Sequence, residues 1–213
     1  MLGFWIYLMN RMQGGGSKVM SFGKSRAKRM AVDAPKITFK DVAGADEAVE
    51  ELHEIVEFLR DSGKFLAVGD KIPKGVLLYG PPGTGKTTVA RLLADATELH
   101  FEQISAVFSG VADLKKAFDA ARARREMGKG TLLFVDEVHR FNRAQQDSFL
   151  PVMEDGTVVL VGATTENPSF ELNAALLSRA RVLVFHSLDT AAIERLFANA
   201  EKIEGKSLPL DAE

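Results

Sequence analysis

The sequence predicts an α/β protein with three layers, in which helices cover both faces of a parallel sheet of about five strands. Three observations support this class. Apolar strand-like runs alternate with helix-like segments along residues 37–188, the runs are apolar on both faces, and a glycine-rich turn joins the first run to a helix. Strands that are buried on both faces and joined by helices are typical of parallel sheets.

Residues 1–36 precede the part that we expect to fold, and they divide into two segments. Residues 1–12 are apolar but too few to span a bilayer, since a spanning helix needs about 20 apolar residues. They fit a truncated membrane helix that contacts a membrane, an interfacial anchor, or an exposed apolar end. Residues 13–36 are a basic linker with glycine and serine. All charges from Arg11 to Arg29 are positive, which fits either a cytoplasmic flank of a membrane or a solvated linker.

Strands and helices are expected to alternate from residue 45 onward. The apolar spacing of three and four residues predicts a first helix over Ala45–Arg60. The expected strands are Val76–Tyr79, Phe101–Ile104, Leu132–Val135, Val158–Val161 and Val182–Phe185. The expected helices between and after them are Thr87–Ala96, Val111–Met127, Ala144–Glu154, Asn173–Leu177 and one that begins at Thr190.

A glycine-rich turn at residues 80–87 carries the most specific chemistry in the chain. It matches the phosphate-binding pattern G-x-x-x-x-G-K-[ST] at every fixed position, between an expected strand and an expected helix. Glycines let backbone N–H groups converge on phosphate oxygens, Lys86 can reach the β- and γ-phosphates, and the Thr87 hydroxyl can bind Mg²⁺. The residues expected to bind ATP are Gly80, Pro81, Pro82, Gly83, Thr84, Gly85, Lys86, Thr87 and Thr88.

Two acids follow the third expected strand. Leu132–Val135 leads directly into Asp136 and Glu137, and ligands of parallel sheets bind beyond the carboxyl ends of the strands. We expect Asp136 to hold Mg²⁺ through water, and Glu137 to orient and deprotonate the attacking water. An ordinary polar strand end is the alternative, and a position about 50 residues after a phosphate loop favours catalysis.

Further polar residues lie at the ends of the last two expected strands. The run from Val158 ends in Thr164, Thr165, Glu166 and Asn167, where a hydroxyl or an amide could bind the γ-phosphate or the attacking water. A threonine there often only caps a turn. Arg179 and Arg181 lie next to the last strand. An arginine delivered to a neighbouring subunit's γ-phosphate can accelerate hydrolysis about 10³-fold or more, whereas a surface arginine is the plainer interpretation.

Composition narrows the classes of function. The 213 residues are 46% hydrophobic and 26% charged, which predicts a globular core, and the net charge of −2 gives no general indication of a nucleic-acid partner. Basic and acidic residues are interleaved over 113–129, which favours a solvated mixed face over a DNA-binding one. No cysteine is present, and the four histidines lack metal-ligand spacing, so no zinc is expected. We expect His53 on a polar face.

These residues support a resemblance to the AAA+ ATPases, a superfamily of three-layer phosphate-loop NTPases, in two branches. Residues 1–86 resemble the FtsH membrane-anchored AAA proteases on the sequences at 12–16, 20–25, 39–44 and 71–77. In that family the first two of these sequences join a membrane helix to the ATPase. The resemblance implies that Asp41, Val42 and Ala43 lie against the adenine.

Residues 88–197 resemble the RarA/MgsA replication-associated recombination ATPases. The resemblance rests on the sequences at 104–107, 109–111, 134–142, 145–147, 162–170 and 176–181. It implies that Thr165 is the sensor at the end of the fourth strand. It also implies that Arg179 is the arginine that acts on a neighbouring subunit, with Arg181 as the fallback, although Ala180 replaces the cysteine of the family's Ser-Arg-Cys sequence.

The changeover falls in the phosphate loop, which both branches share. The chain is therefore similar to a hybrid, and a natural recombinant, a designed sequence and an assembly error would look alike. The expected AAA+ core covers 37–188, and 189–213 is expected to begin a helical lid that is largely missing.

Three hypotheses follow for the function. The first is a homo-oligomeric, DNA-dependent RarA-type ATPase that uses ATP and Mg²⁺ in replication or recombination, with forked or single-stranded DNA as partner. The second is a fragment of a membrane-tethered FtsH-type protease or unfoldase, without the zinc-protease sequence His-Glu-x-x-His. The third is a nucleotide-binding module without useful turnover because the lid is truncated. The expected location is the cytoplasm or the inner face of the membrane.

Overall fold

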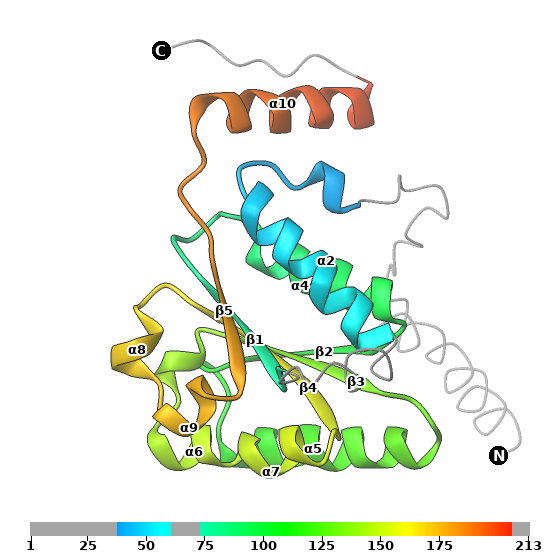
Figure 1. Ribbon diagram of the computed structural model, residues 1–213, viewed down its shortest axis with the longest axis vertical. Helices are drawn as coiled ribbons and strands as arrows, with labels where there is room; N and C mark the ends of the chain where they lie inside the picture. Colours follow the sequence, from blue (N-terminus) through cyan, green and yellow to red (C-terminus); the bar gives the residue numbers. More distant parts are fainter. Residues whose placement is uncertain (1–37, 61–72, 206–213) are drawn as a thin grey trace, which may run out of the picture. The chain divides into compact units, whose positions relative to one another are not determined.

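The computed structural model describes residues 38–60 and 73–205, and at its centre is a five-stranded parallel sheet (Figure 1). The spatial order of the strands is β2-β3-β4-β1-β5, and every neighbouring pair is parallel. The expected α/β class and parallel sheet are therefore confirmed. The strands are β1 (Gly75–Tyr79), β2 (His100–Ser105), β3 (Thr131–Asp136), β4 (Val158–Thr164) and β5 (Ala180–Val184).

Helices precede the first strand, connect consecutive strands and follow the last one. They are η1 (Phe39–Asp41), α2 (Asp46–Arg60), α4 (Lys86–Thr97), α5 (Val111–Glu126), η2 (Val138–Arg140), α6 (Arg143–Asp147), α7 (Phe149–Glu154), α8 (Pro168–Glu171), α9 (Ala174–Leu177) and α10 (Thr190–Glu204). No helix in 38–60 or 73–205 is long and apolar enough to cross a membrane. The predicted segments at 1–12 and 13–36 lie outside the described residues.

One expected helix is wrong as a single element. The segment Ala144–Glu154 forms two short helices, α6 and α7, that meet at Ser148. Pro151 explains the break, because proline has no N–H to donate and its ring would clash with the carbonyl of Asp147 in a continuous helix. The break also places Pro151 in the first turn of α7, where proline is tolerated.

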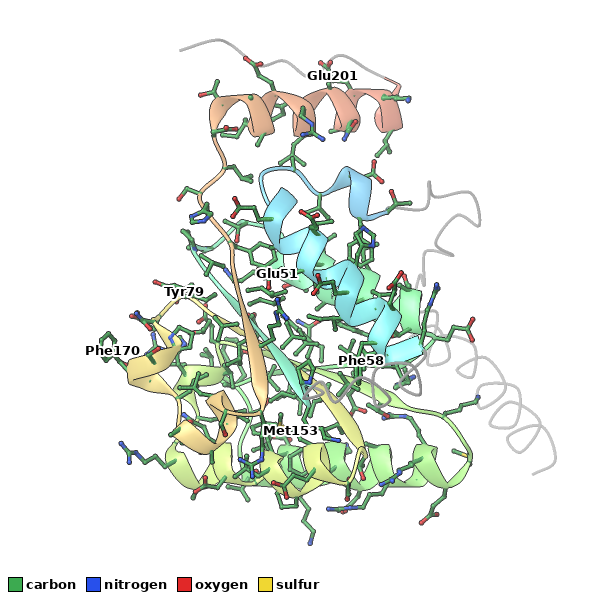
Figure 2. The ribbon with its side chains drawn as sticks, in the orientation of Figure 1. Glu51, Phe58, Tyr79, Met153, Phe170 and Glu201 are labelled. Atoms are coloured by element: carbon green, nitrogen blue, oxygen red, sulfur yellow. The ribbon has the colours of Figure 1, made fainter. Side chains whose placement is uncertain are left out.

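Helices cover the two faces of the sheet as separate layers (Figure 1). Alternate residues of one strand point to opposite faces, so Val76 and Leu78 of β1 belong to one core and Leu77 belongs to the other. The first core lies under α2 and α4, and the second lies under α5, α7 and α9. Figure 2 labels Met153, which belongs to the second core.

The outermost strands differ from the expectation that every strand is apolar on both faces. β3 is buried from Thr131 to Val135, whereas β5 exposes Val182 and Val184 and buries Leu183. β2 is likewise half-exposed. These two strands lie at the edges of the sheet, where each has a strand neighbour on one side only.

The FtsH-like helix α2 packs on the RarA-like core. Leu52 of α2 is fully buried in the same cluster as Leu93 of α4 and Phe185 after β5. Two polar contacts join the same parts. Arg60 donates to the carbonyl of Ala96 at 2.7 Å, and Arg181 on β5 donates to Glu51 at 2.9 Å (Glu51 is labelled in Figure 2). No described side chain has a buried polar atom without a hydrogen-bond partner. The two resemblances therefore share one packed core.

Candidate functional site

The glycine-rich turn follows β1 and leads directly into α4. Gly80 donates its N–H to the carbonyl of Thr164 at 3.1 Å, which fixes the turn to the end of β4. Gly83 and Gly85 have φ values of 78° and 84°, which glycine adopts without the steric cost that other residues incur. Gly85 is the N-cap of α4, so the unpaired N–H groups of the first helical turn face the turn itself. This is the arrangement that binds phosphate.

Lys86 lies inside this turn. Its Nζ donates to the carbonyl oxygens of Gly80 at 2.7 Å and Pro81 at 2.6 Å, and the residue is buried. Burial lowers the pKa of Lys86, and the negative charges of Glu137 and Asp136 oppose that shift. The two carbonyl oxygens therefore hold the Lys86 amino group beside the turn.

Asp136 and Glu137 reach the same pocket from the end of β3. In the sheet, β3 and β1 lie on either side of β4, so the acids and the glycine-rich turn flank one strand end. A pocket of about 410 Å³ is lined by Pro82, Gly83, Gly85, Lys86, Thr87, Thr88, Asp136 and Glu137. The structure thus brings together the expected phosphate, magnesium and water-activating residues.

The Glu137 carboxylate has polar neighbours at the end of β4. Thr165 Oγ1 donates to Glu137 Oε2 at 3.3 Å. His139 Nδ1 lies 3.3 Å from the same oxygen and 2.9 Å from Thr164 Oγ1. The expected sensor Thr165 therefore contacts the expected catalytic acid directly.

Arg179 lies at the other end of the strands, just before β5 begins. Its backbone carbonyl accepts from the N–H of Lys74, just before β1 begins. Its guanidinium donates to Glu154 at 2.8 Å and to the carbonyl of Ala175 at 2.9 Å. Because the phosphate-binding turn follows the other end of β1, Arg179 does not join the site of its own chain. The fallback Arg181 is bound to Glu51 of α2.

The expected adenine-contacting residues do not line the pocket. Val42 and Ala43 are buried, and Val42 belongs to the core under α2. The Asp41 carboxylate caps η1 by accepting from the N–H and the hydroxyl of Thr38, both at 2.8 Å. These two hydrogen bonds lower the pKa of Asp41. The side chain of Asp41 is thus already engaged.

Two further expectations concern the charged residues of α5 and the position of the histidines. Basic residues of α5 face acids, because Arg122 pairs with Asp119 and Arg125 pairs with Asp155. This agrees with the expected mixed face. His53 is exposed and packs edge-on against Phe39. His139 is the functional candidate that the sequence patterns missed. Its signals were a place two residues after Glu137 and within the RarA-like sequence at 134–142.

This fold and this turn define a nucleotide-binding protein of the phosphate-loop α/β class. A model of the ATPase family associated with various cellular activities (AAA) matches residues 76–188. The chain belongs to this family, whose name implies the use of ATP.

Curated relatives fall into both expected branches. ATP-dependent zinc metalloprotease FtsH 1 of Conexibacter woesei is 55% identical over 149 residues, 67% of this chain and 22% of that protein. Replication-associated recombination protein A of Escherichia coli K12 is 53% identical over 143 residues, 63% of this chain and 32% of that protein. The two matches cover 67% and 63% of this chain, so they must overlap in part of it. The double resemblance is confirmed, and the chain spans less than a third of either relative.

A solved structure shows the same fold. A mutant of Thermotoga maritima RuvB superposes with a TM-score of 0.61 at 24% sequence identity, over 79% of this chain and 55% of that one. At this identity the likeness concerns the fold alone.

Proposed function

We propose that this chain binds Mg-ATP in the pocket between the glycine-rich turn and the end of β3, and hydrolyses it there. The observation that carries the proposal is the set of residues that line this one pocket. A buried lysine, a helix N-terminus, a threonine hydroxyl and two carboxylates converge on it. These are the groups that phosphoryl transfer to water requires.

The Thr87 hydroxyl and the Asp136 carboxylate are the proposed magnesium ligands. Both supply oxygen, and Mg²⁺ is usually held by one or two carboxylates, waters and substrate phosphates. Both residues line the pocket, so the donor set fits the ion. When bound, Mg²⁺ would neutralise charge on the phosphates.

The other roles belong to residues of this chain. The N–H groups of the turn and Lys86 would bind the phosphates, and Glu137 would orient the attacking water and accept its proton. Thr165 would hold the Glu137 carboxylate, which it already contacts. Asp41, Val42 and Ala43 are proposed to contact the adenine through their backbone, because the Asp41 side chain caps η1.

A homo-oligomer is part of the proposal. Arg179 lies at the amino-terminal ends of the strands, so it cannot act on its own chain's nucleotide at their carboxyl ends. We propose that it acts on a neighbouring subunit. Its ion pair with Glu154 is partly exposed, with 36% of the arginine side chain accessible. An exposed pair is worth only about 0–1 kcal/mol, so it can open when a γ-phosphate is offered.

We favour a DNA-dependent ATPase of the recombination type, acting in the cytoplasm. Relatives named replication-associated recombination protein A support this, and that of Haemophilus influenzae is 58% identical over 125 residues. The partner would be forked or single-stranded DNA. The second candidate, an FtsH-type unfoldase with membrane contact by residues 1–12, is supported by the FtsH relative.

A steady-state ATPase assay at several protein concentrations tests the proposal. It is run alone, with single-stranded DNA, with forked DNA and with an unfolded protein. We expect turnover per chain that rises with protein concentration and rises further with DNA. Stimulation by unfolded protein instead of DNA would favour the FtsH-type function. Nucleotide binding without turnover under every condition would contradict hydrolysis and leave a binding module.

A further inference from the structure

We propose that His139 is a positioning residue that fixes the Glu137 carboxylate through an Nδ1–H donor and links it to Thr164 at the end of β4. This inference rests on the proposed ATP hydrolysis at Glu137. It concerns a residue whose side chain acts on the catalytic acid and not on the nucleotide, because His139 is not among the residues that line the pocket.

The backbone brings His139 back beside Glu137. Glu137 has φ 51° and ψ 47°, the left-handed conformation, and is the N-cap of the 3-10 turn η2. A non-glycine residue rarely adopts this conformation, and such positions cost about 1–3 kcal/mol that the surroundings must offset. The sharp turn directly after β3 places a side chain two residues later against the carboxylate.

The contacts of His139 are short and sheltered. Nδ1 lies 3.3 Å from Glu137 Oε2 and 2.9 Å from Thr164 Oγ1, and only 6% of the imidazole side chain is accessible. Thr164 is itself fully buried. Hydrogen bonds that are shielded from water are stronger than those at the surface, so they fix the orientation of the two side chains more firmly.

Counting protons assigns the tautomer. Thr164 Oγ1 accepts from the N–H of Glu166 at 3.1 Å and lies 3.2 Å from the Glu166 carbonyl, to which its hydroxyl can donate. We assign the hydroxyl proton to that carbonyl, which leaves His139 Nδ1 to supply the proton between the two side chains. The same Nδ1–H faces the Glu137 carboxylate, which can only accept. An unprotonated Nδ1 would set two acceptors against each other at 3.3 Å.

Both neighbours act on one oxygen of the acid. Thr165 Oγ1 and His139 Nδ1 each lie 3.3 Å from Oε2 of Glu137. Oε1 is therefore the oxygen that remains for the attacking water. A purely structural histidine would satisfy Thr164 alone, and its loss would weaken the fold whether or not Glu137 is present.

Matched variants separate positioning from packing. His139→Leu removes the donor, His139→Asn keeps an amide N–H near the position of Nδ1, and His100→Leu replaces an exposed histidine at the start of β2 as the control. We expect His139→Leu to lower kcat by about tenfold or more with little change in Kd for ATP, His139→Asn to recover most of it, and His100→Leu to match the parent.

A double-mutant comparison tests the route through Glu137. In a Glu137→Gln background, His139→Leu should lower the residual turnover by less than about twofold, because the carboxylate that it positions has been replaced by an amide that cannot take a proton from water. A full, independent loss in that background would overturn the proposal, as would a His139→Asn protein no more active than His139→Leu.

A measurement without turnover keeps this inference separate from the proposed function. Nitrogen-15 NMR of histidine-labelled full chain reports the imidazole tautomer. We expect the Nδ1–H form at His139 and a shift of its Nδ1–H resonance in Glu137→Ala. If the parent protein failed to hydrolyse ATP, the proposed function would fail, whereas an Nε2–H tautomer at His139 would overturn this inference whatever the turnover.

Discussion

The Thr165 hydroxyl donates a 3.3 Å hydrogen bond to the Glu137 carboxylate, although the two residues are 28 positions apart in the chain. The contact forms because β3 and β4 are parallel neighbours whose carboxyl ends meet at one edge of the sheet. The proposed general base and the hydroxyl that contacts it thus follow different strands. The site depends on the register of the sheet as much as on the local sequence.

Replacing Glu137 by glutamine should separate binding from chemistry. The amide is close in shape to the carboxylate and still accepts from Thr165, but it cannot take a proton from water. We expect Glu137→Gln to bind ATP with a Kd within about threefold of the parent and to lose at least about 10²-fold in kcat. Isothermal titration and an ATPase assay check the two parts. Undiminished turnover would refute the assigned role.

The glycines of the turn should differ in their sensitivity to substitution. A Cβ at Gly80 would lie 2.0 Å from the Phe185 carbonyl oxygen, whereas Gly85 has open space around it and only a positive φ. We expect Gly85→Ala to cost about 1–2 kcal/mol and Gly80→Ala about 3–5 kcal/mol in the free energy of unfolding. Urea denaturation measures both losses in the free energy of unfolding. Equal losses would show that Gly80 does not lie as close to Phe185 as the structure has it.

The strands, the helices and the glycine-rich turn were predictable from the sequence, because each depends on a pattern of neighbouring residues. The alternation of apolar runs and helical patterns gave the sheet and its helices, and the G-x-x-x-x-G-K-[ST] pattern located the turn. A strand that ends in Asp136 and Glu137 was sufficient to place two acids beside that turn, because parallel strands direct their carboxyl ends to one edge.

Features that depend on tertiary contact were not predictable in the same way. The left-handed backbone at Glu137 and the contacts of His139 arise from a turn that no residue pattern marks. Thr164 and Thr165 are adjacent and chemically identical, and only the structure shows that Thr165 contacts Glu137 while Thr164 faces His139. The break in the helix at Ser148 has a local signal in Pro151, which cannot donate a backbone hydrogen bond.

Arg179 should be required in trans. We expect Arg179→Ala to lower kcat by about 10³-fold, while its stability falls by no more than about 1 kcal/mol because the ion pair with Glu154 is partly exposed. Arg181→Ala is the matched variant, because it also removes a half-exposed ion pair, with Glu51. It should retain most activity, since Arg179 is the arginine proposed to act on the neighbouring subunit.

Mixing inactive proteins tests the subunit assignment. Glu137→Gln keeps Arg179, and Arg179→Ala keeps an intact pocket, so mixed oligomers would contain complete sites. We expect the mixture to regain turnover that neither variant has alone. No recovery at any ratio, or a larger loss in Arg181→Ala than in Arg179→Ala, would contradict the assignment of Arg179.

The contact between the FtsH-like helix and the RarA-like core should carry a large share of the stability. Leu52 on α2 is fully buried, so Leu52→Ala should cost about 2–5 kcal/mol through lost contacts and a cavity. Glu57→Ala on the exposed side of the same helix should stay within about 0.5 kcal/mol. Equal and small effects in urea denaturation would show that α2 does not pack on the core.

The most direct test of the account is calorimetric titration of the full chain with Mg²⁺ and a non-hydrolysable ATP analogue. We predict saturable heat for one nucleotide per chain, and at least about tenfold weaker binding by Lys86→Ala, whose missing ammonium can no longer meet the phosphates. Lys116→Ala, on the exposed face of α5, should bind like the parent. Folded parent protein that gives no heat of binding would contradict the central claim.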